Sequence, residues 1–259
     1  MKSEESKEIL TSVAKSLFST IPYAGTALTE LVFDYNGRLK QNRLNKFIEI
    51  LAESFTKNSD INLNNIKTEH FNDLFEAVIK RVVSTKSESK LRRFKDILIN
   101  ELINPTESDT VDIYLDLINN LSDNEILILN HHRHFDKSYI KEIARRDELR
   151  EELNKALENK KRESNIMDIS SSSHNNETIR AIETEIRMIE EKHNKLKEFR
   201  SPAFYNLDEN KYFFYIQRLY SQGLLIDIGI GRIGTEPFYI MSITEFGINF
   251  LKFLKDFKD

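Results

Sequence analysis

Three histidines lie close together near the middle of the chain: His131, His132 and His134, followed by Asp136. His131 and His134 share a helical face, so they could hold a metal ion together. A catalytic metal site needs three well-placed ligands, and the sequence offers no second ligand cluster. Cysteine is absent, which excludes thiolate ligands and disulfides. We therefore predict no metal site and no cofactor.

A second candidate for chemistry is the pair Arg187 and His193. Five residues separate them, a spacing found in the Arg–His motif of HEPN ribonucleases. Met188 stands where that family prefers a polar residue, and His193 falls on the apolar seam of a predicted coiled coil. We interpret His193 as a packing residue and predict that the protein is not an enzyme.

Three glycines, Gly229, Gly231 and Gly234, fit the Gly-x-Gly-x-x-Gly pattern of nucleotide-binding loops. No strand–helix crossover follows them, so we interpret them as turn residues between two short apolar strands. The amphipathic helix before them ends at Gly223, and the turn 242–247 after them opens a final helix. This order of elements predicts a small C-terminal winged-helix-like α+β domain.

The rest of the chain is predicted to be mainly α. Apolar residues at helical spacing predict helices at 38–56, 68–84, 87–103, 108–120 and 126–134, with 57–65 as a loop. We assign 1–121 to an N-terminal helical bundle and 122–135 with 201–259 to the winged-helix-like domain. Residues 136–200 are an inserted antiparallel coiled-coil hairpin with a disordered tip at 164–176.

The coiled-coil hairpin is predicted from a seam of apolar residues at alternating steps of three and four. The returning arm carries Ile179, Ile182, Ile186, Ile189, His193 and Leu196, and the outgoing arm carries Leu149, Leu153 and Ala156. Outside this seam the arms contain few large apolar residues. We expect the hairpin to bind a protein partner or a second copy of the chain.

The net charge is −4, and residues 200–259 hold seven basic and seven acidic side chains. Nucleic acid is therefore a less favoured partner, because phosphate neutralisation supplies most non-specific affinity. Under the alternative of DNA binding, the contacts would be Lys211, Gln217, Arg218 and Arg232. Positive charge gathers instead in a possible anionic-partner patch: Lys80, Arg81, Lys86, Lys90, Arg92, Arg93 and Lys95. A smaller group, Arg38, Lys40, Arg43 and Lys46, precedes it.

We expect a cytoplasmic protein, because the first residues do not resemble a secretory signal. Peripheral attachment to the inner membrane stays open. The apolar stretch 17–32 contains Pro22 and Gly25 and is too short to span a bilayer. It could pack in the bundle, or it could insert into an anionic membrane surface beside the basic helices.

The sequence resembles the Abi-alpha family of bacterial abortive-infection proteins at both ends. Near the N-terminus the resemblance lies in Leu17-Phe18-Ser19-Thr20-Ile21-Pro22-Tyr23-Ala24-Gly25 and continues through Arg38, Arg43, Leu44, Asn45 and Phe47. Near the C-terminus it lies in Arg218-Leu219-Tyr220-Ser221-Gln222-Gly223-Leu224-Leu225, followed by Thr244-Glu245-Phe246-Gly247-Ile248-Asn249-Phe250. The resemblance implies a part in phage defence and supplies no catalytic residues. We therefore expect a non-enzymatic defence protein acting through protein contacts, with a winged-helix DNA-binding transcriptional regulator as the alternative.

Overall fold

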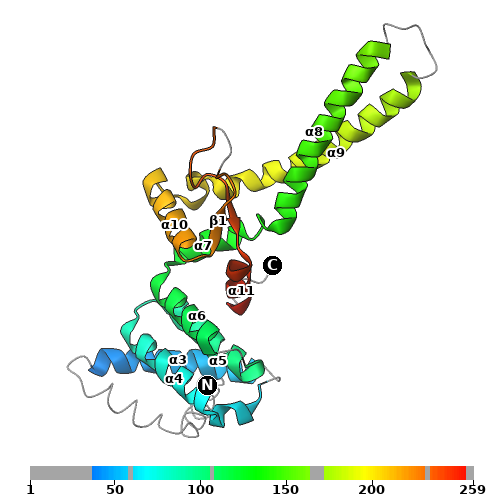
Figure 1. The fold of residues 1–259 in the computed structure, drawn as a ribbon. Helices are drawn as coiled ribbons and strands as arrows, with labels where there is room; N and C mark the ends of the chain where they lie inside the picture. Colours follow the sequence, from blue (N-terminus) through cyan, green and yellow to red (C-terminus); the bar gives the residue numbers. More distant parts are fainter. Residues whose placement is uncertain (1–36, 58–60, 106–107, 164–171, 231–233, 255–259) are drawn as a thin grey trace, which may run out of the picture. The chain divides into compact units, whose positions relative to one another are not determined.

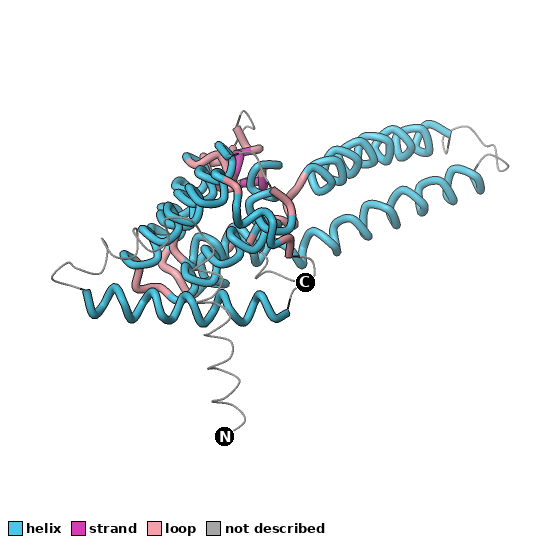
Figure 2. Tube along the Cα trace, turned by 90° about the horizontal axis from the view of Figure 1, so that it is seen from below, coloured by secondary structure: helices cyan, strands magenta, loops and turns pink. Residues whose placement is uncertain are grey.

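The computed structural model describes residues 37–57, 61–105, 108–163, 172–230 and 234–254. Within these ranges the chain is mainly helical with one small two-stranded sheet, as the cyan and magenta segments of Figure 2 show. The predicted mainly α class is confirmed. Two features of the sequence, the stretch 17–32 and Arg232, lie outside the described residues.

The described residues divide into two compact units. The first holds those up to Asp123 together with those from Asn249 onward, and the second runs from Asn124 to Ile248. The division falls at the start of one helix and inside the last one. The end of the last helix therefore belongs to the first unit, whereas the sequence assigned 201–259 to one domain.

The first unit is built from four helices and a short 3₁₀ segment. They are α3 (Gly37–Lys57), η1 (Leu63–Lys67), α4 (Glu69–Ser84), α5 (Glu88–Ile103) and α6 (Ser108–Asn120). The predicted helix bounds were within one residue of these four, but η1 occupies part of the segment 57–65 that was predicted to be a loop. Side-chain caps explain two of the starts: Thr68 accepts from the amide of Phe71, and Ser87 from that of Lys90.

The core of the first unit is a layer of fully buried aliphatic and aromatic side chains. It includes Phe47, Ile79, Phe94, Ile97, Leu102, Leu115 and Ile118. These residues recur at helical spacing on α3 to α6, which is why the four helices pack together. The end of the last helix joins this core, since Tyr114 lies 5.4 Å from Phe250 and 4.9 Å from Phe253, measured between ring centroids.

The second unit contains α7 from Asn124 onward, a long helical pair, and the small sheet. Its elements are α7 (Asp123–His132), α8 (Lys137–Glu163), α9 (Ser172–Leu196), η2 (Lys197–Arg200), η3 (Pro202–Tyr205), α10 (Glu209–Ser221), β1 (Leu225–Asp227), β2 (Met241–Ile243) and the start of α11 (Glu245–Phe253). The helix predicted at 126–134 is α7, which begins and ends earlier.

The sheet of the second unit is antiparallel, with Leu225 opposite Ile243 and Asp227 opposite Met241. The segment after α7 borders β2, because the carbonyl of Phe135 accepts from the amide of Ile243 at 3.0 Å. Helix α11 starts tightly against this sheet. A Cβ atom at Gly247 would lie 2.5 Å from the backbone oxygen of residue 224, so only glycine fits there.

Helices α8 and α9 lie side by side as a hairpin that extends away from α7, α10 and the sheet (Figure 1). The seam predicted from the sequence faces inward: Leu149, Ile179, Ile186 and His193 are buried. From Arg150 to Arg162 every residue of α8 is exposed except two half-buried seam positions. Since α9 begins at Ser172, the last five residues of the predicted tip are helical. The rest of that tip lies outside the described residues.

A compact group of side chains fixes the base of the hairpin to the rest of the second unit. We call Phe135, Tyr139, Ile143, Leu196 and Phe199 the base cluster. Arg200 covers it, with its guanidinium carbon 3.8 Å from the ring centroid of Phe135. The same guanidinium donates to the carbonyl of residue 241 in β2 at 2.5 Å, so the hairpin base and the sheet are held by one side chain.

None of the helices in the described ranges is long and apolar enough to cross a membrane.

Candidate functional surfaces

The basic patch predicted on α4 and α5 is largely paired with acidic side chains. Ion pairs join Lys80 to Glu76 at 2.5 Å, Arg81 to Asp116 at 2.7 Å, Arg92 to Glu88 at 2.9 Å, Arg93 to Asp123 at 2.8 Å and Lys95 to Asp96 at 2.5 Å. Lys90 donates to the backbone carbonyl of Asn119, and Lys86 is exposed. An anionic partner would therefore have to compete with carboxylates that already occupy most of the patch.

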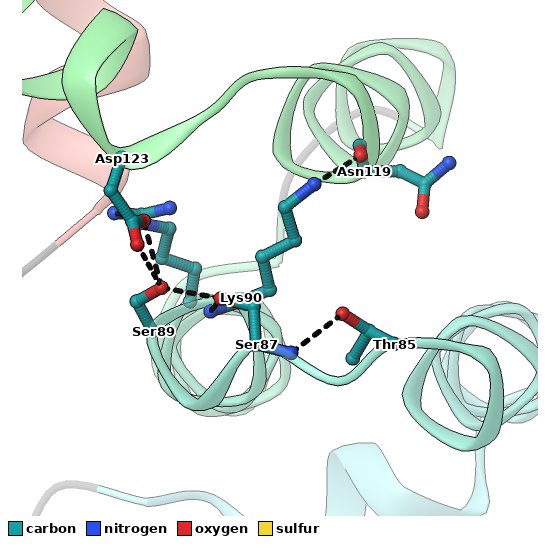
Figure 3. A network of polar contacts seen from close by, with 7 residues as sticks. Thr85, Ser87, Ser89, Lys90, Asn119 and Asp123 are labelled. Carbon is teal, nitrogen blue, oxygen red and sulfur yellow. Dashed lines mark hydrogen bonds and ion pairs between the residues drawn. The ribbon is translucent and has the colours of Figure 1, made fainter.

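One network in this patch is shown in Figure 3. The hydroxyl of Ser89 donates to both carboxylate oxygens of Asp123, at 2.7 and 2.9 Å, and contacts the hydroxyl of Ser87 at 2.6 Å. Arg93 is buried beneath it and pairs with the same carboxylate. Burial alone would raise the pKa of Asp123, but the Ser89 and Arg93 contacts outweigh burial and lower it. The network fixes the start of α5 to Asp123.

The smaller basic group on α3 meets the patch at a shared carboxylate. Lys46 and Arg92 both contact Glu88, and these contacts lower its pKa, with the Lys46 hydrogen bond as the largest cause. Arg43 donates to the carbonyl of residue 83 at 2.7 Å. Lys46 of the smaller group and Arg92 of the patch thus meet around a carboxylate that reduces their positive potential.

The predicted DNA contacts on α10 do not form a basic surface. Lys211 and Gln217 are exposed, whereas Arg218 forms a 3.1 Å ion pair with Glu125 of α7. The side chain of Glu125 is fully buried and that of Arg218 is 34% exposed. Removing this arginine for phosphate contact would leave a buried carboxylate without its cation, which is costly. Arg218 therefore connects α10 to α7.

The three neighbouring histidines have two kinds of environment. His132 is fully buried, and its Nδ1 donates to the carbonyl of Ile128 at 2.8 Å. Burial lowers the pKa of His132 to about 3, so it is neutral at physiological pH. The rings of His131 and His134 pack on Phe199, at centroid distances of 4.7 and 5.5 Å. Among the described residues, no group of three or more His, Asp or Glu side chains could hold a metal ion.

Arg187 and His193 face different surroundings. Arg187 is 70% exposed and lies 3.9 Å from Glu191 on its own helix. His193 is buried in the seam, where its Nε2 donates to Glu142 of α8 at 3.0 Å. A hydrogen bond from Lys192 is the largest cause of the lowered pKa of Glu142. The geometry assigns His193 to helix pairing, as we predicted from its seam position.

Sequence reasoning missed the carboxylates that partner the basic residues. Glu125 was not recognised as the partner of Arg218, 93 residues away. The only indication in the sequence was that Glu125 lies three and four residues before Ile128 and Leu129, and therefore on the same, buried face of the helix. No family model, no curated protein and no solved structure matches the chain.

Proposed function

We propose that the chain is a non-enzymatic protein that acts through protein contacts, with the α8–α9 hairpin as its contact device. The observation that carries the proposal is the pattern of burial along the hairpin. One narrow seam holds the arms together, and most of the other positions are exposed and many are charged. Such a pair contributes little to a core, so its length is better explained by a contact made outside the unit.

Charge pairs between the arms support a stiff hairpin. Arg145 reaches Glu185 at 3.2 Å, and Arg150 reaches Glu190 at 2.5 Å. Each exposed pair contributes little alone, but together they select one register of the arms. A partner would therefore meet a preformed surface, which lowers the entropy cost of binding.

The second part of the proposal is a winged-helix-like domain that serves as the platform for the hairpin. Its support is the order α10, β1, β2 and the backbone bond from Ile243 to Phe135, which places a third chain segment beside β2. Domains of this kind bind either DNA or protein. The pairing of Arg218 with Glu125 favours protein, because it removes a cation from the exposed face of α10.

The cellular role we propose is phage defence, and it rests on the resemblance of the sequence to the Abi-alpha family. An anionic membrane surface is a weaker candidate partner, because most of the basic patch is paired. The test is a phage challenge of bacteria that carry the gene, compared with a variant in which 145–192 is replaced by a short Gly/Ser linker. The linker variant keeps the base cluster and the Glu142–His193 pair.

We expect the linker variant to fold and melt cooperatively but to lose protection. Protection that survives the deletion would exclude the hairpin as the contact device, and a protein that unfolds would show that the hairpin is part of the core. The DNA-binding alternative is tested by gel shift at physiological salt. Strong duplex binding with a steep salt dependence would favour the transcriptional regulator.

A further inference from the structure

One residue of the second unit has a backbone conformation that is unusual for its type. Phe238 has a φ of 70°, in the left-handed region that favours glycine. For a bulky side chain this conformation is strained. Among the other described residues that are not glycine, Asn206 alone has a positive φ, and asparagine tolerates it. The contacts around Phe238 must therefore hold it in place.

Phe238 lies in a four-residue turn between β1 and β2, which we call the Pro237 turn (residues 236–239). The amide of Tyr239 donates to the carbonyl of Glu236 at 3.4 Å and closes this turn. The ring of Pro237 fixes φ near −65° at the second position. A proline there, followed by a positive φ at the third position, is typical of a type II turn. The third position of that turn is usually glycine, whereas here it is Phe238.

A type II turn has a close alternative in the type I turn. The two differ mainly in the orientation of the peptide between the second and third residues, which is rotated by nearly half a revolution. In a type I turn Phe238 would have a φ near −90°, where a side chain is not strained. The rotation would also exchange two polar groups, because the carbonyl of Pro237 would take the direction that the amide of Phe238 has now.

The carboxylate of Asp227 on β1 holds the turn in the strained conformation. This buried group accepts from the amide of Phe238 at 2.7 Å and from the amide of Gly229 at 2.8 Å. Both partners are donors, and an ionised carboxylate, which only accepts, satisfies both. In a type I turn the same carboxylate would face the carbonyl of Pro237, a second acceptor. The charge of Asp227 therefore favours the type II turn.

We propose that the peptide between Pro237 and Phe238 is a two-position switch, and that the charge on Asp227 sets its position. When the carboxyl takes up a proton from solvent, one oxygen still accepts from the amide of Gly229. The other becomes an O–H donor, which fits the carbonyl of Pro237 in the type I position. The same rotation relieves the strain at Phe238. Hydrogen bonding and backbone strain thus favour the same change once the charge is gone.

The switch would act on an aromatic contact between the turn and α10. The ring of Phe238 packs against Tyr220 with 5.4 Å between centroids. Rotation about φ redirects this ring, so Tyr220, which is 39% exposed, would lose its cover. The switch therefore links the charge of one buried group to the surface of α10. It does not depend on the hairpin contact.

Other charged and titratable groups of the described residues surround this turn. Glu236 lies in it and is exposed. The hydroxyl of Tyr239 donates to Glu209 of α10 at 3.3 Å. Arg200 donates to the carbonyl of Met241, the residue opposite Asp227 in β2. Glu236 provides a matched control, since it is a carboxylate of the same turn that does not accept from the amide of Phe238.

The test is NMR spectroscopy of the full chain, using the nuclear Overhauser effect between the Hα proton of Pro237 and the amide proton of residue 238. This signal is strong in a type II turn and about tenfold weaker in a type I turn, because the peptide rotation separates the two protons. Asp227→Asn supplies a neutral amide that can accept from Gly229 and donate to the carbonyl of Pro237. Glu236→Gln is the control. The double variant Asp227→Asn/Phe238→Gly places glycine where a positive φ carries no strain.

We expect a strong signal in the parent chain and in Glu236→Gln, a signal about tenfold weaker in Asp227→Asn, and a partial recovery in the double variant. Hydrogen exchange of the Ile228 amide, which donates to the carbonyl of Ile240 at 2.9 Å, reports whether the neighbouring strands stay paired. A strong signal in Asp227→Asn, or no recovery in the double variant, overturns the proposal. Loss of the Ile228 protection in Asp227→Asn also overturns it, because Asp227 would then hold the strands together instead of selecting the turn.

Discussion

The buried ion pair between Glu125 and Arg218 allows a quantitative test of the second unit. Arg218→Met keeps most of the apolar stem but removes the cation that partners a fully buried carboxylate. Removing one member of a buried pair costs about 3 to 5 kcal/mol, because the remaining charge is left uncompensated. The side chain of Arg218 is 34% exposed, so water can reach the site. We therefore expect the lower end, about 3 kcal/mol.

The assay is urea denaturation followed by circular dichroism, with two companion variants. Arg187→Met is the matched control, since Arg187 is 70% exposed and only loosely paired; it should change stability by less than about 0.5 kcal/mol. The double variant Glu125→Leu/Arg218→Met removes both charges and should recover most of the loss. If Arg218→Met is as mild as the control, the pair does not connect α10 to α7, and Arg218 becomes available again as a DNA contact.

Three further outcomes follow from single side chains. His193→Ala should cost about 1 to 2 kcal/mol through lost packing and pairing while Arg187→Ala is nearly neutral, and RNA cleavage abolished by either change would instead identify an enzyme. Burial lowers the pKa of His132 from 6.5 to about 3, so as pH falls this histidine is protonated in the unfolded chain before it is protonated in the folded one. The free energy of unfolding should therefore drop by up to about 1.4 kcal/mol per pH unit below 6.5. His132→Gln should flatten that slope in urea titrations. Gly247→Ala should lower the free energy of unfolding by about 2 kcal/mol, because the new Cβ would clash with the backbone oxygen of Leu224, just before β1. An unchanged melting temperature would refute that close approach.

The helices were predictable because their signals are local. Apolar spacing and the caps at Thr68 and Ser87 lie within a few residues of the helix that they define. The hairpin seam was predictable for a related reason: a period of three and four residues along one arm requires a facing arm, whatever the rest of the fold. The buried positions Ile179, Ile186 and His193 follow that period.

The electrostatic character of the basic patch could not be predicted in the same way. Along the chain, residues 80–95 contain one acidic side chain. The carboxylates of Asp116 and Asp123 lie on α6 and just after it, and they reach Arg81 and Arg93 only after α6 has packed against α4 and α5. Charge runs in a sequence therefore overstate the positive potential of a surface when partners come from other helices.

Because the contacts that anchor the hairpin lie at its base, the length of the hairpin can change without a change in the rest of the fold. The base cluster, Arg200 and the Glu142–His193 pair all lie at or below the first turns of the arms. Beyond them the seam repeats with a period of seven residues, so deleting one matched repeat from each arm would shorten the hairpin by about 10 Å and restore the same facing positions. The length of the arms can therefore change in steps of seven residues while the contacts that anchor the base stay the same.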